Sequence, residues 1–102
     1  MTASESPPTA ATVRFTVRAS AEPSVLPRVI ELFALRNLVP SSLRARRGGR
    51  SAEDLHIDIE VAGLAAAEVR LVAAKITEMV PVESVLAGEG PRPVEMAFRR
   101  SA

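Results

Sequence analysis

The sequence predicts an α+β fold in which a four-stranded antiparallel sheet carries two helices on one face. Residues 12–19 and 53–62 alternate apolar and polar positions, which is typical of half-buried strands. Residues 24–36 and 64–79 repeat apolar positions every three or four residues, which is typical of amphipathic helices. A glycine pair at residues 48–49 indicates a hairpin between two strands. Together these patterns predict the element order β-α-β-β-α-β.

The chain of 102 residues has the length of one domain, and 47% of its residues are hydrophobic, so a buried core is expected. Residues 1–10 are rich in serine, threonine and proline and are expected to form a flexible N-terminal tail. The folded domain is expected over residues 11–88. Residues 89–102 then form a C-terminal extension, within which residues 94–98 are compatible with a short extra strand.

The first strand is expected over residues 12–19. It directs Val13, Phe15 and Val17 to one face, because successive side chains of a strand point to opposite sides. Branched and aromatic residues at these positions also favour a strand over a helix.

The first helix is expected to begin after Ser24, a residue type that caps helix N-termini. Pro27 is tolerated in the first turn, because the amide hydrogen that proline lacks would have no partner inside the helix. The helix should end near residues 36–37, and Pro40 prevents it from continuing. The stripe expected to face the core consists of Leu26, Val29, Ile30 and Phe33.

The second strand is expected over residues 41–47, with Leu43 and Ala45 pointing inward. The third strand, over residues 53–62, has the clearest alternation in the chain. Its inward positions are Leu55, Ile57, Ile59 and Val61.

The second helix is expected over residues 64–79, where Glu68 near the start and Lys75 near the end both suit the helix dipole. The last strand is expected over residues 80–87, with Pro81 placing it at a sheet edge or at the beginning of the strand. This order is the split β-α-β arrangement of a ferredoxin-like sandwich, in which the third strand lies between the first and the second.

Charged residues on the outward face of the sheet are expected to neutralise one another across strands. The basic members are Arg14, Arg18, Arg44 and Arg46, and the acidic members are Asp58 and Glu60. The outward positions of the expected central strands also lack the aromatic residues that stack on bases, so nucleic-acid binding by the sheet is not expected. The basic stretch at residues 44–50 keeps two interpretations: charge that protects an edge strand from pairing, or a contact with phosphates or an acidic partner surface.

The composition argues against an enzyme. The chain has no cysteine and one histidine, His56, near which only Asp54 and Asp58 could serve as further metal ligands. We therefore expect no catalytic residue, no metal site and no cofactor in this chain. Because the longest apolar runs are far shorter than the roughly 20 residues that cross a bilayer, we also expect a cytoplasmic protein without membrane contact.

The loop before the first helix is the remaining candidate binding site. The amides at a helix N-terminus form a natural seat for a carboxylate, although an ordinary β–α turn with a cap is the alternative interpretation. The candidate effector-binding residues are Glu22, Pro23, Ser24, Val25 and Leu26.

Several segments, in their order and spacing, resemble those of an ACT domain. The segments are residues 23–33, 36–39, 43–45, 55–61 and 75–85. Over residues 12–88 the chain is most similar to the short regulatory subunit of acetolactate synthase, which has a single ACT domain. Amino-acid-binding ACT domains usually carry Asn and Gly in the loop before the first helix, whereas the matching positions here hold Ala21 and Ser24. The resemblance therefore favours subunit activation over effector binding.

The resemblance implies a homodimer whose sheets join across an edge, with both helix layers on one side. It also implies that this subunit binds and activates a large catalytic subunit that carries thiamine diphosphate, Mg²⁺ and FAD. The candidate dimer or partner contacts are Leu32, Leu35, Arg44, Arg46 and Arg47. The alternative is a stand-alone ACT domain that binds a small amino acid, such as a branched-chain one, at its dimer interface.

Overall fold

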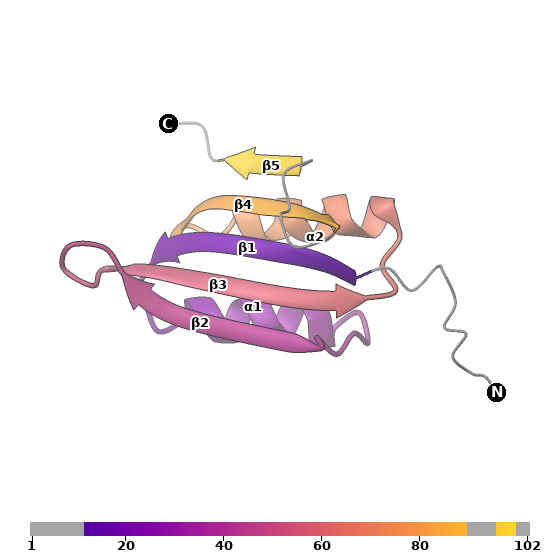
Figure 1. Cartoon of the computed structure of the whole chain (residues 1–102), viewed down its shortest axis with the longest axis horizontal. Coiled ribbons are helices and arrows are strands. Elements are labelled where there is room, and N and C mark those ends of the chain that lie inside the picture. Colours follow the sequence, from indigo (N-terminus) through magenta and orange to yellow (C-terminus); the bar gives the residue numbers. More distant parts are fainter. Residues whose placement is uncertain (1–11, 90–95, 100–102) are drawn as a thin grey trace.

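The computed structural model describes residues 12–89 and 96–99 (Figure 1). The tail expected over residues 1–10 lies outside these ranges. In chain order the elements are β1 (Thr12–Ser20), α1 (Val25–Ala34), β2 (Ser42–Gly48), β3 (Asp54–Ala62), α2 (Ala66–Thr77), β4 (Val82–Glu89) and β5 (Met96–Arg99).

The strands form one antiparallel sheet in the order β2-β3-β1-β4-β5, so β3 lies between β1 and β2 as expected. Both helices cover the same face of the sheet (Figure 1). The opposite face carries neither of these helices, and we call it the open face. The ferredoxin-like α+β fold predicted from the sequence is confirmed.

A fifth strand extends the expected four-stranded sheet. β5 pairs antiparallel with β4, with Leu86 opposite Ala97, so β4 is an interior strand. Pro81 immediately precedes β4, where its missing amide hydrogen removes no bond from the ladder. Of the strand expected over residues 94–98, residues 94 and 95 lie outside the described residues. The sheet has two edges, β2 with seven residues and β5 with four.

The core lies between the sheet and the two helices. The rings of Phe15 in β1 and Phe33 in α1 are both fully buried and meet edge to face, with centroids 5.5 Å apart. Val25 and Val29 complete the buried stripe of α1. The prediction that Ile30 belongs to this stripe is wrong: its side chain is 42% exposed, because the stripe follows positions 25, 29 and 33 and leaves position 30 on a flank.

Two further expectations are corrected by local geometry. Ser24 stands at the N-cap of α1, but its side chain makes no capping hydrogen bond. Leu43 and Ala45 lie opposite Ile59 and Ile57, hence on the helix side of the sheet, yet both are exposed. The helix layer does not extend far enough to cover the edge strand β2.

The second helix is shorter than expected and begins at Ala66. Its start is stabilised by Glu68, whose carboxylate accepts a hydrogen bond of 3.1 Å from the backbone amide of Ala65. No helix among the described ranges is both long and apolar enough to span a bilayer.

Candidate functional site

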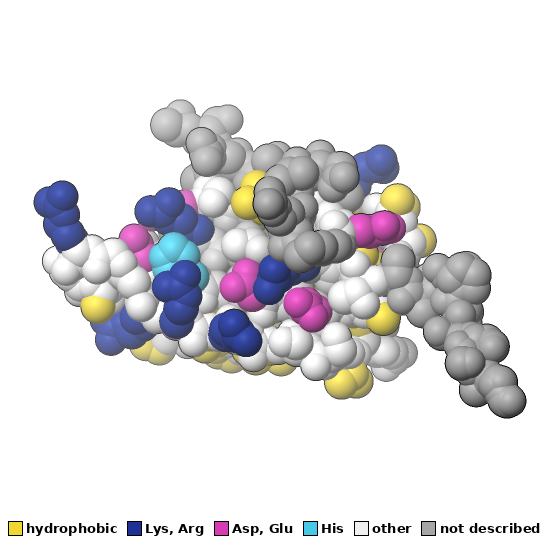
Figure 2. Space-filling model, viewed as in Figure 1, with side chains coloured by type: hydrophobic (Ala, Val, Ile, Leu, Met, Phe, Trp, Pro, Cys, Tyr) yellow, Lys and Arg dark blue, Asp and Glu magenta, His cyan; other side chains and the backbone are white. Residues whose placement is uncertain are grey.

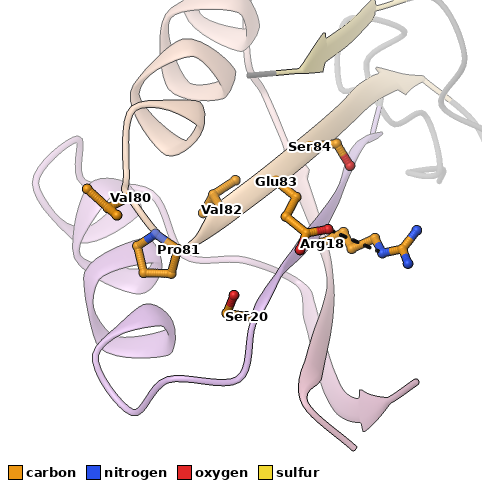
Figure 3. Close-up of a pocket in the computed structure, with 7 residues that line it drawn as sticks. All are labelled: Arg18, Ser20, Val80, Pro81, Val82, Glu83 and Ser84. Atoms are coloured by element: carbon orange, nitrogen blue, oxygen red, sulfur yellow. Dashed lines mark ion pairs between the residues drawn. The ribbon is translucent and has the colours of Figure 1, made fainter. Parts of the chain in front are cut away.

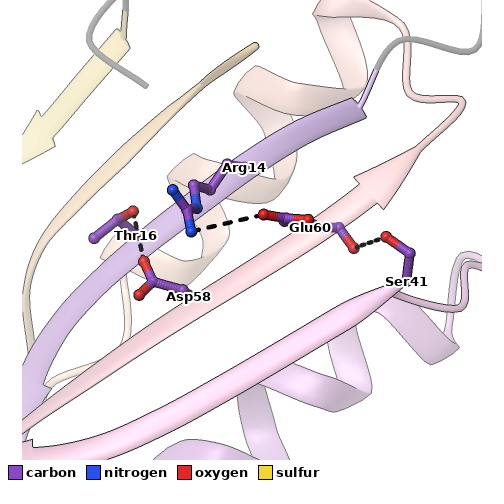
Figure 4. Close-up of polar contacts among 5 residues, drawn as sticks. All are labelled: Arg14, Thr16, Ser41, Asp58 and Glu60. Carbon is purple, nitrogen blue, oxygen red and sulfur yellow. Dashed lines mark hydrogen bonds and ion pairs between the residues drawn. The ribbon is translucent and has the colours of Figure 1, made fainter. Parts of the chain in front are cut away.

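The open face carries rows of polar side chains across β2, β3 and β1. Arg14 forms an ion pair of 3.6 Å with Glu60 on the neighbouring strand, as expected from the sequence (Figure 4). The hydroxyl of Thr16 donates a hydrogen bond of 2.9 Å to the Asp58 carboxylate. Ser41 in turn donates to the backbone carbonyl of Glu60 at 3.1 Å. The carboxylates of Glu60 and Asp58 are thus held by side chains of β1, and the residue before β2 is joined to the backbone of β3.

The other arginines do not pair as predicted. Arg18 meets Asp54 at 3.6 Å and Glu83 at 3.7 Å, instead of Asp58 or Glu60. Arg44 lies opposite Asp58 in the β2–β3 register, and Arg46 lies opposite His56. Neither arginine forms an ion pair within the described part of the chain. Among the described residues the ion pairs of the open face are therefore formed by the arginines of β1, and the arginines of its β2 side remain without one.

A hollow of about 440 Å³ lies where β1 ends and β4 begins (Figure 3). Arg18 and Glu83 supply opposite charges at its wall, and Val80 supplies an exposed apolar surface. Its lining residues are Arg18, Ser20, Val80, Pro81, Val82, Glu83 and Ser84. Such a wall can contact a small polar molecule, but its ion pairs are long and exposed and hold the two side chains weakly.

The β2–β3 hairpin passes close to Asp54, the acid that pairs with Arg18. Gly49 has φ +85°, and a Cβ built there would lie 2.7 Å from the Asp54 carboxylate oxygen that pairs with Arg18. Gly63 has a similar φ of +86°, but a Cβ there would contact nothing within 4 Å. The two glycines therefore share a backbone conformation, but only at Gly49 does a side chain occupy the space where a Cβ would lie.

Gly49→Ala is expected to lower the free energy of unfolding by roughly 2–3 kcal/mol, since the left-handed backbone costs an alanine roughly 1–2 kcal/mol and Asp54 must also move. Gly63→Ala is the matched control, and we expect it to cost about 1–2 kcal/mol. Urea denaturation measures both. Equal losses for the two variants would contradict the proposed contact with Asp54.

A second hollow, of about 220 Å³, lies between the β1–α1 loop and β2. It brings Glu22, Pro23 and Leu26 together with Arg47 and Leu55. Of the remaining candidate effector-binding residues, Ser24 is exposed at the start of α1 and Val25 is buried in the core. The loop and the end of β2 thus share one shallow site, which the sequence pattern had treated as two separate features.

The amides at the start of α1 offer less to an anion than the sequence suggested. The amide of Val25 already donates to the carbonyl of Glu22 at 3.1 Å. Pro23 and Pro27 have no amide hydrogen. A carboxylate in this hollow would instead meet the guanidinium of Arg47, whose Nε donates to the carbonyl of Ala52 at 2.9 Å.

The candidate contact residues are dispersed. Leu32 is half-buried against the core, whereas Leu35, at the C-cap of α1, is 73% exposed. Arg44 and Arg46 lie on the open face, and Arg47 lies on the helix side with the second hollow. They therefore belong to different surfaces of the molecule.

One surface was missed from the sequence. Leu26 lines the second hollow beside β2, and Ile30 lies one helical turn further along the same flank of α1. Leu43 is exposed on the same side of β2, at 39%. Figure 2 shows hydrophobic side chains along the lower border of the molecule in that view. Only the partial exposure of Ile30 and Leu43 reveals this apolar flank, since their sequence pattern is that of core residues.

The described ranges contain no group of three or more acidic, histidine or cysteine side chains able to hold a metal ion. His56 lies between Arg18 and Arg46 in the sheet register, which places two cations beside it.

Comparison with known families decides the identity of the domain. The family model described as an ACT-like domain matches residues 6–91. The chain belongs to the ACT-like domain family. ACT domains are regulatory, non-catalytic modules, so this ACT-like domain is placed among regulatory and binding modules.

A solved structure agrees with this fold. The solution structure of the C-terminal domain of the MgtC protein from Mycobacterium tuberculosis has a TM-score of 0.68 to this ACT-like domain, at 11% sequence identity. The similarity covers 89% of this chain and 99% of that one. No curated protein matches the sequence.

Proposed function

We propose that this ACT-like domain is the non-catalytic regulatory subunit of an acetolactate synthase, which it binds and activates in the cytoplasm. The observation that carries the proposal is the exposed edge at β2. Seven residues there pair with β3 on one side only in the described structure, and exposed apolar side chains flank them. An edge of this kind is a surface for assembly with another chain.

The proposal includes a homodimer joined across β2, which the free edge supports. β5 covers β4, so the long free edge of the sheet is β2. Joining two copies there would pair their outer backbone groups and bring the apolar flanks with Ile30 and Leu43 together. Such a dimer has one continuous sheet, with both helix layers on one side.

The decisive test mixes the full chain with the acetolactate synthase catalytic subunit from the same genome. We expect co-elution of the two proteins on size-exclusion chromatography and faster acetolactate formation than with the catalytic subunit alone. The absence of both a complex and any rate increase would refute the proposed subunit role.

The alternative is a stand-alone ACT domain that senses a small amino acid. The second hollow favours it, because Arg47 can meet a carboxylate while Leu26 and Leu55 can contact an apolar side chain. Calorimetry against branched-chain and aromatic amino acids tests this function, with Arg47→Gln as the comparison variant. Absence of heat and of any rise in melting temperature would argue against it.

A further inference from the structure

The charges of the open face are segregated between its two halves. The acids engage partners on the β1 side: Glu60 with Arg14, Asp58 with Thr16, and both Asp54 and Glu83 with Arg18. Figure 2 shows basic side chains gathered toward the hairpin end of this face. The arginines without an ion pair therefore lie on the β2 side of this face, next to a β1 side on which four acids face two arginines.

Three arginines without an ion pair form a group that we call the β2 arginine cluster. Arg44 and Arg46 lie on the open face of β2, and Arg50 lies in the adjoining hairpin. All three side chains are exposed, and none forms an ion pair with another described residue. No internal contact requires arginine at these positions.

We propose that the β2 arginine cluster is the docking surface for an acidic surface segment of the catalytic subunit, an inference that rests on the proposed function. Guanidinium groups bind carboxylates through paired hydrogen bonds and lose less hydration than ammonium groups, so they suit protein contacts. The whole chain carries a formal net charge of only +1, so the attraction is confined to this cluster.

The setting of the cluster favours a protein over a nucleic acid or a small anion. Phe15 and Phe33 are buried in the core and cannot stack on bases. The cluster lies outside both hollows described above, since Arg44, Arg46 and Arg50 line neither of them. A flat row of cations matches an extended acidic surface.

Dimer formation across β2 would strengthen this surface. Because both open faces would lie on the same side of the joined sheet, the clusters of the two copies would adjoin at the twofold axis. Like charges opposed across paired strands repel one another. An acidic segment bound over them would remove this repulsion, so docking and dimer formation are expected to support each other.

The test compares the full-length double variant Arg44→Glu/Arg46→Glu with the control Arg28→Glu/Arg70→Glu. The control arginines are exposed, lie on α1 and α2 on the opposite face, and form no ion pair with described residues. Biolayer interferometry measures binding to the immobilised catalytic subunit between low and high salt. We expect the β2 variant to bind about tenfold more weakly, with a smaller salt dependence, and the control to match the wild type.

The outcomes separate the two proposals. Failure of the wild-type chain to bind would remove the subunit role, and the docking surface with it. Tight wild-type binding that the β2 variant retains would overturn the docking surface alone. The docking surface is also overturned if the wild-type chain binds a single-stranded RNA probe and the β2 variant loses that binding. Arg44→Gln/Arg46→Gln serves as a second variant, because it removes the charge without adding new repulsion between copies.

Discussion

Replacing Phe33 with alanine is expected to remove a large part of the stability of the domain. The ring is fully buried and meets Phe15 edge to face, so its loss leaves a cavity that the surrounding sheet and helix cannot close. Truncation of a buried phenylalanine costs about 3–5 kcal/mol, against a total of about 5–15 kcal/mol for a typical domain. Urea denaturation followed by circular dichroism measures the change.

Val39→Ala provides the comparison for this loss. Val39 is 86% exposed, so its truncation is expected to change the free energy of unfolding by less than about 0.5 kcal/mol. A Phe33→Ala protein as stable as Val39→Ala would mean that α1 does not pack on the sheet as described.

Ile30→Glu is expected to convert the proposed dimer into a monomer. In a symmetric interface each substitution acts twice, and burying two glutamates beside β2 removes apolar contact and adds unpaired charge. We expect the dissociation constant of the dimer to rise about 100-fold or more, a change of about 3 kcal/mol. Sedimentation velocity over a range of protein concentrations measures it.

Leu71→Glu is the matched control, because Leu71 is 46% exposed, close to the 42% of Ile30, and lies on α2. It is expected to remain dimeric. If Ile30→Glu leaves the dimer intact, or if Leu71→Glu disrupts it equally, the interface does not lie along the apolar flank beside β2.

The period-two strands could be predicted because their local pattern and their packing agree. In β1 and β3 every apolar position on the expected face is buried, from Val13 to Ala19 and from Leu55 to Val61. The core between sheet and helices buries these alternating side chains, and a shift by one residue would expose all of them. The hairpin glycines and the two helices follow from equally local rules.

The candidate site was less accessible from the sequence. Glu22, Pro23 and Leu26 were identified as one loop, but their partner in the second hollow, Arg47, lies more than 20 residues further along the chain. The pairing of Arg18 depends on where the hairpin places Asp54 and where β4 begins with Glu83. No pattern within a single strand carries that information.

The sequence by itself determined the element order and the core face of each central strand, because these depend on residue type and short-range spacing. Only the tertiary structure decided which apolar residues stay exposed and which arginines form ion pairs. Ile30 and Leu43 have the pattern of core residues, but the helix layer ends before β2 and leaves them open. Arg14 and Arg44 look equivalent in the sequence and each lies opposite an acid of β3, but Glu60 pairs with Arg14, whereas the Asp58 carboxylate opposite Arg44 accepts a hydrogen bond from Thr16 of β1.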